Sequence, residues 1–211
     1  MRVVLQRVRS ASVSIGGAEV AAIDTGLLVL LGFSQWDAPG AQAAADTEWL
    51  CRKVLAARLF PSPEGRQWAG SAGSERLPLL LVSQFTLHGN LRKPKPDFHK
   101  SAGTGGARAL WEAAVAAFQR QHSGGRVAVG VFGADMEVRL CNWGPVTLTL
   151  DSANKREVYW EEGQAAGGGG GGSSSGGAGA GEQAAGLEGG EDLGEASEAA
   201  QAAGSGVSES K

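Results

Sequence analysis

The feature that most limits how this chain can fold is an abrupt change in composition after residue 160. Every Trp, Phe and Tyr lies in residues 1–160, whereas residues 161–211 hold 17 of the 34 glycines. The only larger aliphatic residues of the second segment are Leu187, Leu193 and Val207. Such a segment buries too little apolar surface to offset the entropy lost on ordering. We therefore expect one folded domain over residues 1–160 and a disordered Gly/Ala/Ser/Glu-rich acidic tail over residues 161–211.

The charge of the chain divides at the same point. Residues 1–160 contain 18 Lys and Arg against 13 Asp and Glu, and residues 161–211 contain one against nine. The formal net charge of −3 therefore combines a domain of +5 with a tail of −8. A basic domain is compatible with a phosphate-bearing partner, because bound phosphates release counterions, although an ordinary solvated surface also accounts for the charge.

The cysteines and the amino terminus bear on the cellular compartment. Cys51 and Cys141 lie far apart without the spacing of a metal site, so we expect both to be buried free thiols in a reducing compartment. The first nine residues interleave charged and apolar residues, unlike a signal peptide. No run approaches the roughly 20 apolar residues of a membrane span. The expected location is the cytoplasm.

The apolar pattern predicts an α+β domain with mostly antiparallel sheet and two main helices. Alternating residues around Gly16 and Gly17 indicate a β-hairpin over residues 2–23. The unbroken apolar run 26–33 indicates a strand buried on both faces. Helices are predicted over residues 41–60 and 107–121, and further strands over residues 77–87, 127–131, 136–142 and 146–150.

The common catalytic motifs are absent from the sequence. It has no phosphate-binding loop, no HExxH zinc motif, no paired cysteines and no GxSxG elbow, so we expect no metal and no cofactor. His88, His99 and His122 form no known pairing, and a surface or hydrogen-bonding role is expected for each. A Ser-His-Asp triad stays open, because its members need only meet in space.

Two polar segments interrupt apolar strands. Residues 83–87 read SQFTL and are either a strand end that faces a cleft or an edge strand with Thr chosen for its β-propensity. Residues 142–147 read NWGPVT, and the Gly-Pro within them indicates a hairpin turn or a backbone that approaches something closely.

Together with further motifs, these two segments show that the chain resembles the D-aminoacyl-tRNA deacylases. The resemblance runs from residue 1 to about residue 152, in matching order and spacing. Its motifs are MRVVLQRV (1–8), ASV (11–13), GLLVLLG (26–32), SQFTL (83–87), KPDF (95–98), FGA (132–134) and NxGPVT (142–147). It implies a homodimer with a barrel-like core that hydrolyses the ester of D-aminoacyl-tRNA as proofreading in translation.

The resemblance also implies roles for individual residues. Gly144 and Pro145, joined by a cis bond, would enter the partner subunit's pocket and exclude L-amino acids by bulk. The pocket floor would be the segment Ser83, Gln84, Phe85 and Thr86, whose backbone N–H groups near Phe85 and Thr86 hold the ester carbonyl. Met136 would line the same pocket or fill the core. We expect the Thr86 hydroxyl to orient and not to attack, since no nearby base activates it, and the ribose 2′-hydroxyl of the RNA to assist.

Positive charge is concentrated in the loop that follows the first polar segment. We expect Arg92, Lys93, Lys95 and Lys100 to contact the acceptor end of tRNA, although a merely solvated loop is the alternative. Phe98 either stacks on the terminal adenine or anchors the loop. Many relatives carry Asp where this chain has Trp143, which bears on its substrate range and dimer.

Other functions compatible with the resemblance stay open. Glycine mischarged on tRNA for alanine is an implied second substrate. A related animal deacylase removes L-alanine from tRNA with a trans Gly-Pro, but its first motif is Pro-Gln-Ala-Thr-like, so Ser83 and Phe85 argue against this relative. A nucleic-acid-binding adaptor of the same fold that has lost activity is a third hypothesis.

Overall fold

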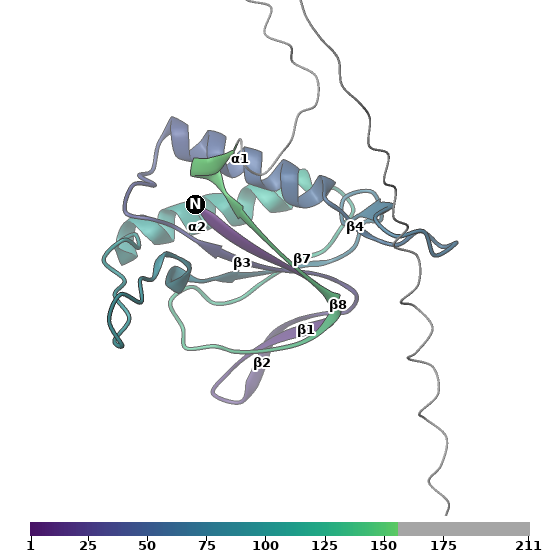
Figure 1. Ribbon diagram of the computed structural model, residues 1–211, viewed down its shortest axis with the longest axis horizontal. Helices are drawn as coiled ribbons and strands as arrows, with labels where there is room; N and C mark the ends of the chain where they lie inside the picture. The colour runs from purple at the N-terminus through teal and green to yellow at the C-terminus, as the bar shows by residue number, and fades with distance from the viewer. Residues whose placement is uncertain (156–211) are drawn as a thin grey trace, which may run out of the picture. The chain divides into compact units, whose positions relative to one another are not determined.

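The computed structural model describes residues 1–155 (Figure 1). The predicted domain end at residue 160 and the predicted disordered tail therefore lie outside the described residues. The elements in chain order are β1 (Arg2–Ile15), β2 (Ala18–Ile23), β3 (Gly26–Gly32), α1 (Ala41–Ala56), β4 (Arg58–Phe60), β5 (Gly70–Ser71), β6 (Leu79–Ser83), the 3-10 helix η1 (Phe85–His88), α2 (Thr104–Gln121), β7 (Val127–Val129), β8 (Glu137–Asp151) and the 3-10 helix η2 (Ser152–Asn154).

The main sheet has the order β2-β1-β3-β6-β7, and β8 pairs with β1. Strand β1 pairs antiparallel with β2, β3 and β8, whereas β3-β6 and β6-β7 are parallel. The sheet is thus mixed. Because β2 also approaches β6 and β7, the sheet curls into a nearly closed barrel. The α+β fold with two main helices is confirmed.

Two layers of apolar side chains explain why β3 and β6 are buried on both faces. Leu27, Val29 and Leu31 of β3 belong to the large core beneath the helices, together with Leu50, Val54 and Phe118 of α1 and α2. The alternate residue Leu28 packs instead with Leu80, Val82 and Val8 inside the barrel. Helices α1 and α2 cover one face of the sheet (Figure 1). The prediction of a strand buried on both faces is confirmed.

Several element boundaries differ from the predictions, and three of them bear on the site. Helix α1 ends at Ala56 and not at residue 60, because Ala57 is extended and Leu59 and Phe60 are buried in strand β4. Helix α2 begins at Thr104, and not at residue 107. Strand β6 ends at Ser83, and the chain turns into η1 where we predicted strand to residue 87.

The carboxyl-terminal part contains one long strand in place of the two predicted. β8 pairs with β1 over residues 137–142 and 147–151, and the register shifts between these two stretches, so that β8 passes Gly144 and Pro145 without turning back. The hairpin turn predicted at Gly-Pro is therefore wrong. Cys141 is exposed, contrary to prediction, because it lies on β8, which pairs with β1 alone among residues 1–155, whereas Cys51 is buried in α1. Among residues 1–155, no helix has the length and apolar character needed to cross a membrane.

Candidate active site

The SQFTL segment lies where the parallel strands β3 and β6 end. The Gln84 N–H donates to the carbonyl oxygen of Leu31 at 2.8 Å, and the chain then turns into η1. A Cβ atom at Gly32 would lie 2.5 Å from the Gln84 carbonyl oxygen, so only glycine allows this close approach. The turn leaves Phe85 57% exposed and Thr86 also exposed. Carboxyl ends of parallel strands are a frequent location for binding sites.

The backbone at the start of η1 offers two free donors. The first N–H groups of a helix have no partner within it. Within the described chain, neither the Phe85 N–H nor the Thr86 N–H donates to another residue. The Thr86 hydroxyl oxygen accepts a bond from the Gln84 side-chain amide at 2.5 Å. No side chain of residues 1–155 accepts the Thr86 proton, so nothing there is placed to ionise this hydroxyl.

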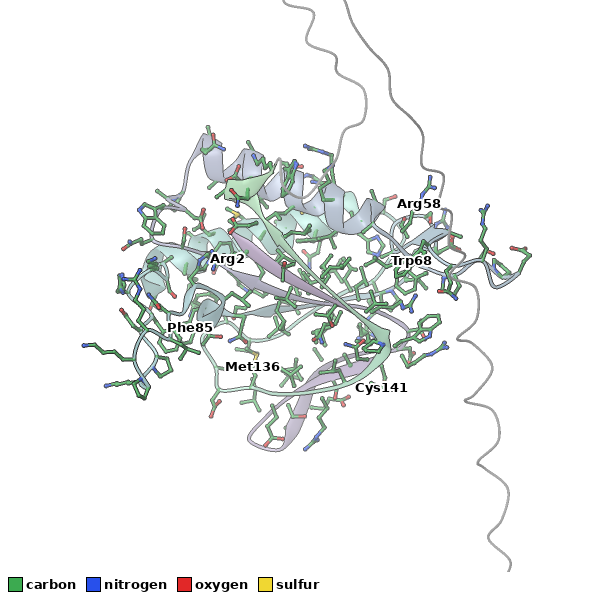
Figure 2. All side chains as sticks on the ribbon, in the orientation of Figure 1. Arg2, Arg58, Trp68, Phe85, Met136 and Cys141 are labelled. Atoms are coloured by element: carbon green, nitrogen blue, oxygen red, sulfur yellow. The ribbon has the colours of Figure 1, made fainter. Side chains whose placement is uncertain are left out.

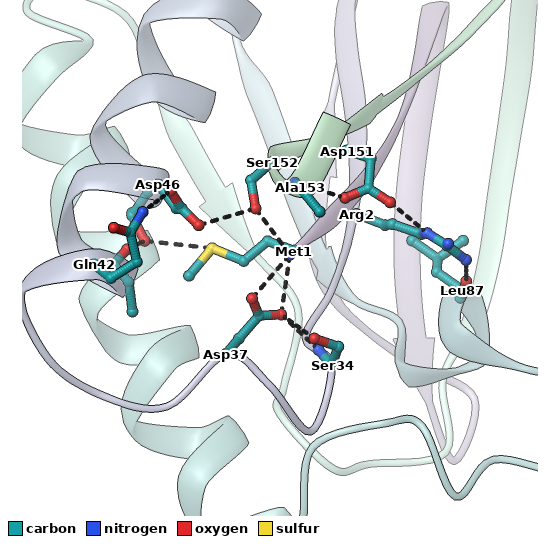
Figure 3. Close-up of polar contacts among 12 residues, drawn as sticks. Met1, Arg2, Ser34, Asp37, Gln42, Asp46, Leu87, Asp151, Ser152 and Ala153 are labelled. Carbon is teal, nitrogen blue, oxygen red and sulfur yellow. Dashed lines mark hydrogen bonds and ion pairs between the residues drawn. The ribbon is translucent and has the colours of Figure 1, made fainter. Parts of the chain in front are cut away.

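A polar network ties η1 to the ends of β1 and β8 (Figure 3). The Arg2 guanidinium donates to the Leu87 carbonyl oxygen at 3.0 Å and to the Asp151 carboxylate at 2.8 Å. Burial raises the pKa of Asp151, but the bond from Arg2 and the N–H of Ala153 outweigh it and lower this pKa overall. Arg2 therefore ties the segment to the adjacent ends of β1 and β8.

The loop after η1 packs against the same segment. The rings of Phe98 and Phe85 are 5.0 Å apart in an edge-to-face arrangement, and the Ser101 hydroxyl donates to the Phe85 carbonyl oxygen at 2.9 Å. Of the two roles predicted for Phe98, these contacts favour the anchor. Arg92, Lys93 and Lys95 are exposed and Lys100 is half-buried. None of these four forms an ion pair with another of residues 1–155.

Met136 lies between β7 and β8 on the side of the molecule that carries Phe85 (Figure 2). It is half-buried against the core inside the barrel, and a Cβ atom at Gly130 would lie 3.0 Å from its sulfur. Met136 thus fills the core at the end of the barrel nearest the SQFTL segment, and part of its side chain remains accessible.

The Gly144-Pro145 corner lies elsewhere on the chain. Its peptide bond is cis, and both residues are exposed. The corner is held by Asn142, whose side chain accepts a bond from the Val146 N–H at 3.1 Å. It is also held by Arg7, which donates to the carbonyl oxygens of Trp143 at 2.9 Å and Leu59 at 2.5 Å. Arg7 is buried, and the sequence reasoning missed it, because an arginine in an alternating strand predicts a solvated side chain.

Trp143 contacts two arginines. The guanidinium of Arg7 lies 4.4 Å and that of Arg9 3.5 Å from the Trp143 ring centroid, and Phe60 packs near the same ring. Burial lowers the pKa of Arg7, and Arg9 lowers it further. A cation over an indole face is attracted by its quadrupole, so the ring compensates in part for this crowding of positive charge.

The two motifs do not meet within one chain. The SQFTL segment contacts β1 at Arg2, and the Gly144-Pro145 corner contacts it at Arg7. Five residues of extended strand span roughly 16 Å. A single copy therefore brings together Ser83 to Thr86, Phe98 and Lys100, but leaves the corner remote from them.

The comparisons with known proteins decide the family. Residues 4–151 match the family described as D-Tyr-tRNA(Tyr) deacylase. The chain belongs to this family. A D-aminoacyl-tRNA deacylase of Solidesulfovibrio magneticus is 45% identical over 73% of this chain and 97% of its own length. D-aminoacyl-tRNA deacylase 1 of Mus musculus is 37% identical over 72% of this chain and 70% of its own.

A solved structure is also similar to this member of the deacylase family. It is described as a c-Myc DNA Unwinding Element Binding Protein, with 36% identity and a TM-score of 0.65 over 72% of this chain and 98% of that one. The family match and the two deacylase relatives confirm the predicted resemblance to the D-aminoacyl-tRNA deacylases.

The three histidines of this deacylase-family chain differ in their partners and burial. His99 is exposed and bonded to Asp97 at 2.5 Å, and His122 is buried and bonded to the Leu77 carbonyl oxygen at 2.8 Å. His88, the last residue of η1, is buried, and its Nε2 has no partner in the described part of the chain. Within residues 1–155 no three His, Cys, Asp or Glu side chains are placed to hold a metal ion.

Proposed function

We propose that this chain hydrolyses the ester bond of D-aminoacyl-tRNA and releases the free D-amino acid and the tRNA. The observation that carries the proposal is the pair of free N–H groups at Phe85 and Thr86, exposed beside a loop with four unpaired cations. Such oriented donors stabilise the negative charge that an ester carbonyl oxygen gains during hydrolysis. Membership of the deacylase family supports the choice of ester.

In this proposal Thr86 orients the substrate and does not attack it. Its hydroxyl oxygen already accepts the Gln84 amide, so the hydroxyl proton is free to be donated to the substrate. An unactivated hydroxyl is a poor nucleophile. The 2′-hydroxyl of the terminal ribose lies next to the ester, and proximity lets the RNA itself activate water. Ser83 and Met136 complete the walls of the pocket.

The proposal requires a homodimer. The corner of Gly144 and Pro145 is exposed and lies roughly 16 Å along β1 from the pocket of its own chain. The corner can act on the substrate if it enters the pocket of a second copy. A rigid backbone there excludes the side chain of an L-amino acid by bulk. A glycyl ester has no side chain to exclude, so glycine on tRNA for alanine is a second proposed substrate.

Contacts with the RNA are assigned to the basic loop. Arg92, Lys93, Lys95 and Lys100 would bind phosphates of the acceptor end, which positions the tRNA without reading its sequence. A reducing compartment such as the cytoplasm is part of the same proposal, because Cys51 and Cys141 are both free thiols.

The deciding experiment incubates the purified chain with D-tyrosyl-tRNA and L-tyrosyl-tRNA and follows release of the amino acid. We expect hydrolysis of the D-ester only. Equal rates on both esters would contradict the steric exclusion, and no hydrolysis of either would contradict the activity. L-alanyl-tRNA and glycyl-tRNA belong in the same assay, because faster cleavage of L-alanine would favour the animal relative. Sedimentation at the assay concentration tests the dimer.

A second candidate function is binding of DNA without catalysis. It is favoured by the solved structure at 36% identity, which is described as a DNA unwinding element binding protein. Titration with duplex DNA alongside the deacylation assay separates the two functions. Tight binding of the duplex by a chain that cleaves no ester would favour the adaptor.

A further inference from the structure

Trp36 is an exposed indole on a firmly held turn. Its residue is 69% exposed, more than any other aromatic residue of the described chain. The Asp37 N–H donates to the Ser34 carbonyl oxygen at 3.0 Å, which closes a turn with Trp36 near its tip. The Asp37 carboxylate accepts the Ser34 N–H at 2.7 Å, the Ser34 hydroxyl at 2.8 Å and the Met1 ammonium at 3.1 Å (Figure 3). The turn is thus fixed, yet it leaves its largest side chain in solvent.

The same turn is joined to the basic loop beside the pocket. The Gln35 N–H donates to the Lys100 carbonyl oxygen at 2.8 Å, and Ser34 forms a β-bridge with Ser101. Ser101 in turn bonds the Phe85 carbonyl oxygen. One short series of hydrogen bonds therefore connects the turn of Trp36 to the segment that contains Thr86.

The charges around Trp36 indicate what it binds. Of the acidic groups in the two segments, Asp37 is neutralised by the Met1 ammonium and Asp97 is bonded to His99. Arg92, Lys93 and Lys95 have no ion pair among residues 1–155. Lys100 has none within 4.0 Å either, although its charge contributes to lowering the pKa of Asp97. Exposed aromatic rings next to unpaired cations bind single-stranded nucleic acid, because bases stack on the ring while cations neutralise phosphates.

We infer that Trp36 stacks on an unpaired nucleobase of the acceptor end of the tRNA substrate. The inference rests on the proposed function and extends it to a binding residue outside the SQFTL segment. Trp36 contributes to the affinity for RNA, whereas Phe85 and Thr86 contact the ester. Its removal should therefore change KM and leave kcat unaltered.

The test compares wild type with Trp36→Phe and Trp36→Leu in hydrolysis of D-tyrosyl-tRNA. Leu keeps an apolar side chain without a ring, so the pair separates stacking from simple burial. We expect Trp36→Leu to raise KM about tenfold, the order of one lost base–aromatic stack, with kcat within twofold of wild type. Trp36→Phe should stay within about threefold. An unchanged KM in Trp36→Leu, or equal effects of Leu and Phe, would overturn the inference.

A binding measurement keeps the inference testable without catalysis. A single-stranded oligoribonucleotide ending in CCA should quench the tryptophan fluorescence of wild type, and Trp36→Leu should lose that part of the quenching. Heparin, a polyanion without bases, is the control and should not quench. If wild type cleaves no ester, the proposed function fails while the oligonucleotide titration still decides on Trp36. A change of oligomeric state in Trp36→Leu would place the indole between protein copies and overturn the inference.

Discussion

The Thr86 hydroxyl accepts one hydrogen bond, and no side chain of residues 1–155 accepts its proton, so its proposed role is to orient the substrate. Thr86→Val keeps the shape of the side chain and removes the hydroxyl. We predict a fall in kcat of about tenfold to a hundredfold for D-tyrosyl-tRNA, since the backbone donors and the RNA 2′-hydroxyl remain. Single-turnover hydrolysis measures it. Thr86→Ser, which restores the hydroxyl, is the control, and complete loss of activity in Thr86→Val alone would indicate a nucleophile.

His88 makes the stability of the fold depend on pH between pH 7 and pH 5. Burial lowers its pKa below the ordinary value, although a bond with the backbone of Gly32 opposes this. The unfolded chain then binds the proton more tightly, so stability is complete above the unfolded pKa of about 6.5 and falls as the pH drops below it. One proton limits the loss to about 1.4 kcal/mol per pH unit. Urea unfolding at pH 7 and pH 5 measures the difference, and His88→Gln should reduce it. An unchanged pH dependence in that variant would contradict the assignment.

At the scale of elements, Arg7 joins β1 to β4 and β8 at the Gly144-Pro145 corner. Its guanidinium satisfies two carbonyl oxygens, those of Trp143 and Leu59. Arg7→Met keeps much of the side-chain volume but leaves these acceptors unpaired. We predict a loss of about 2–5 kcal/mol in the free energy of unfolding. Denaturant unfolding measures it, with the exposed Arg139→Met on β8 as the control. Equal stability of the two variants would show that water replaces the guanidinium.

Periodicity predicted the elements whose burial repeats along the chain. The hairpin at Gly16 and Gly17, the doubly buried β3 and the apolar faces of both helices follow from local pattern alone. The predictions are wrong where contacts with residues distant in sequence determine the structure. α1 stops at Ala56 because Leu59 and Phe60 are buried as strand. The sequence around Pro145 looks like a turn, yet β8 continues because β1 pairs with it on both sides of the corner.

At the scale of the whole molecule, the sequence motifs predicted which segments form the candidate site but not how these segments are arranged in space. SQFTL and the basic loop lie together because both follow β6, and they meet through Phe85, Phe98 and Ser101. The contribution of Arg7 and Trp36 could not be predicted, since burial and exposure depend on strands and turns distant in the chain. The separation of the two motifs within one copy explains why the proposed site needs two.

The acidic tail gives a prediction that depends on charge alone. A chain ending at residue 160 changes the net charge from −3 to +5. The relative from Solidesulfovibrio magneticus matches over 161 residues that make up 97% of its length, and we expect the shortened chain to fold. We predict that the shortened chain has an approximately threefold lower KM for tRNA at low salt, because the negative charges no longer repel phosphate.

The salt dependence separates this electrostatic effect from a direct contact. At about 0.5 M salt the Debye length falls to roughly 4 Å, and the KM values of the full and shortened chains should converge. The control is a full-length chain with the nine acidic residues of positions 161–211 replaced by their amides, which keeps the length and removes the charge. It should behave like the shortened chain. A difference that persists at high salt, or an amide chain that behaves like wild type, would contradict repulsion.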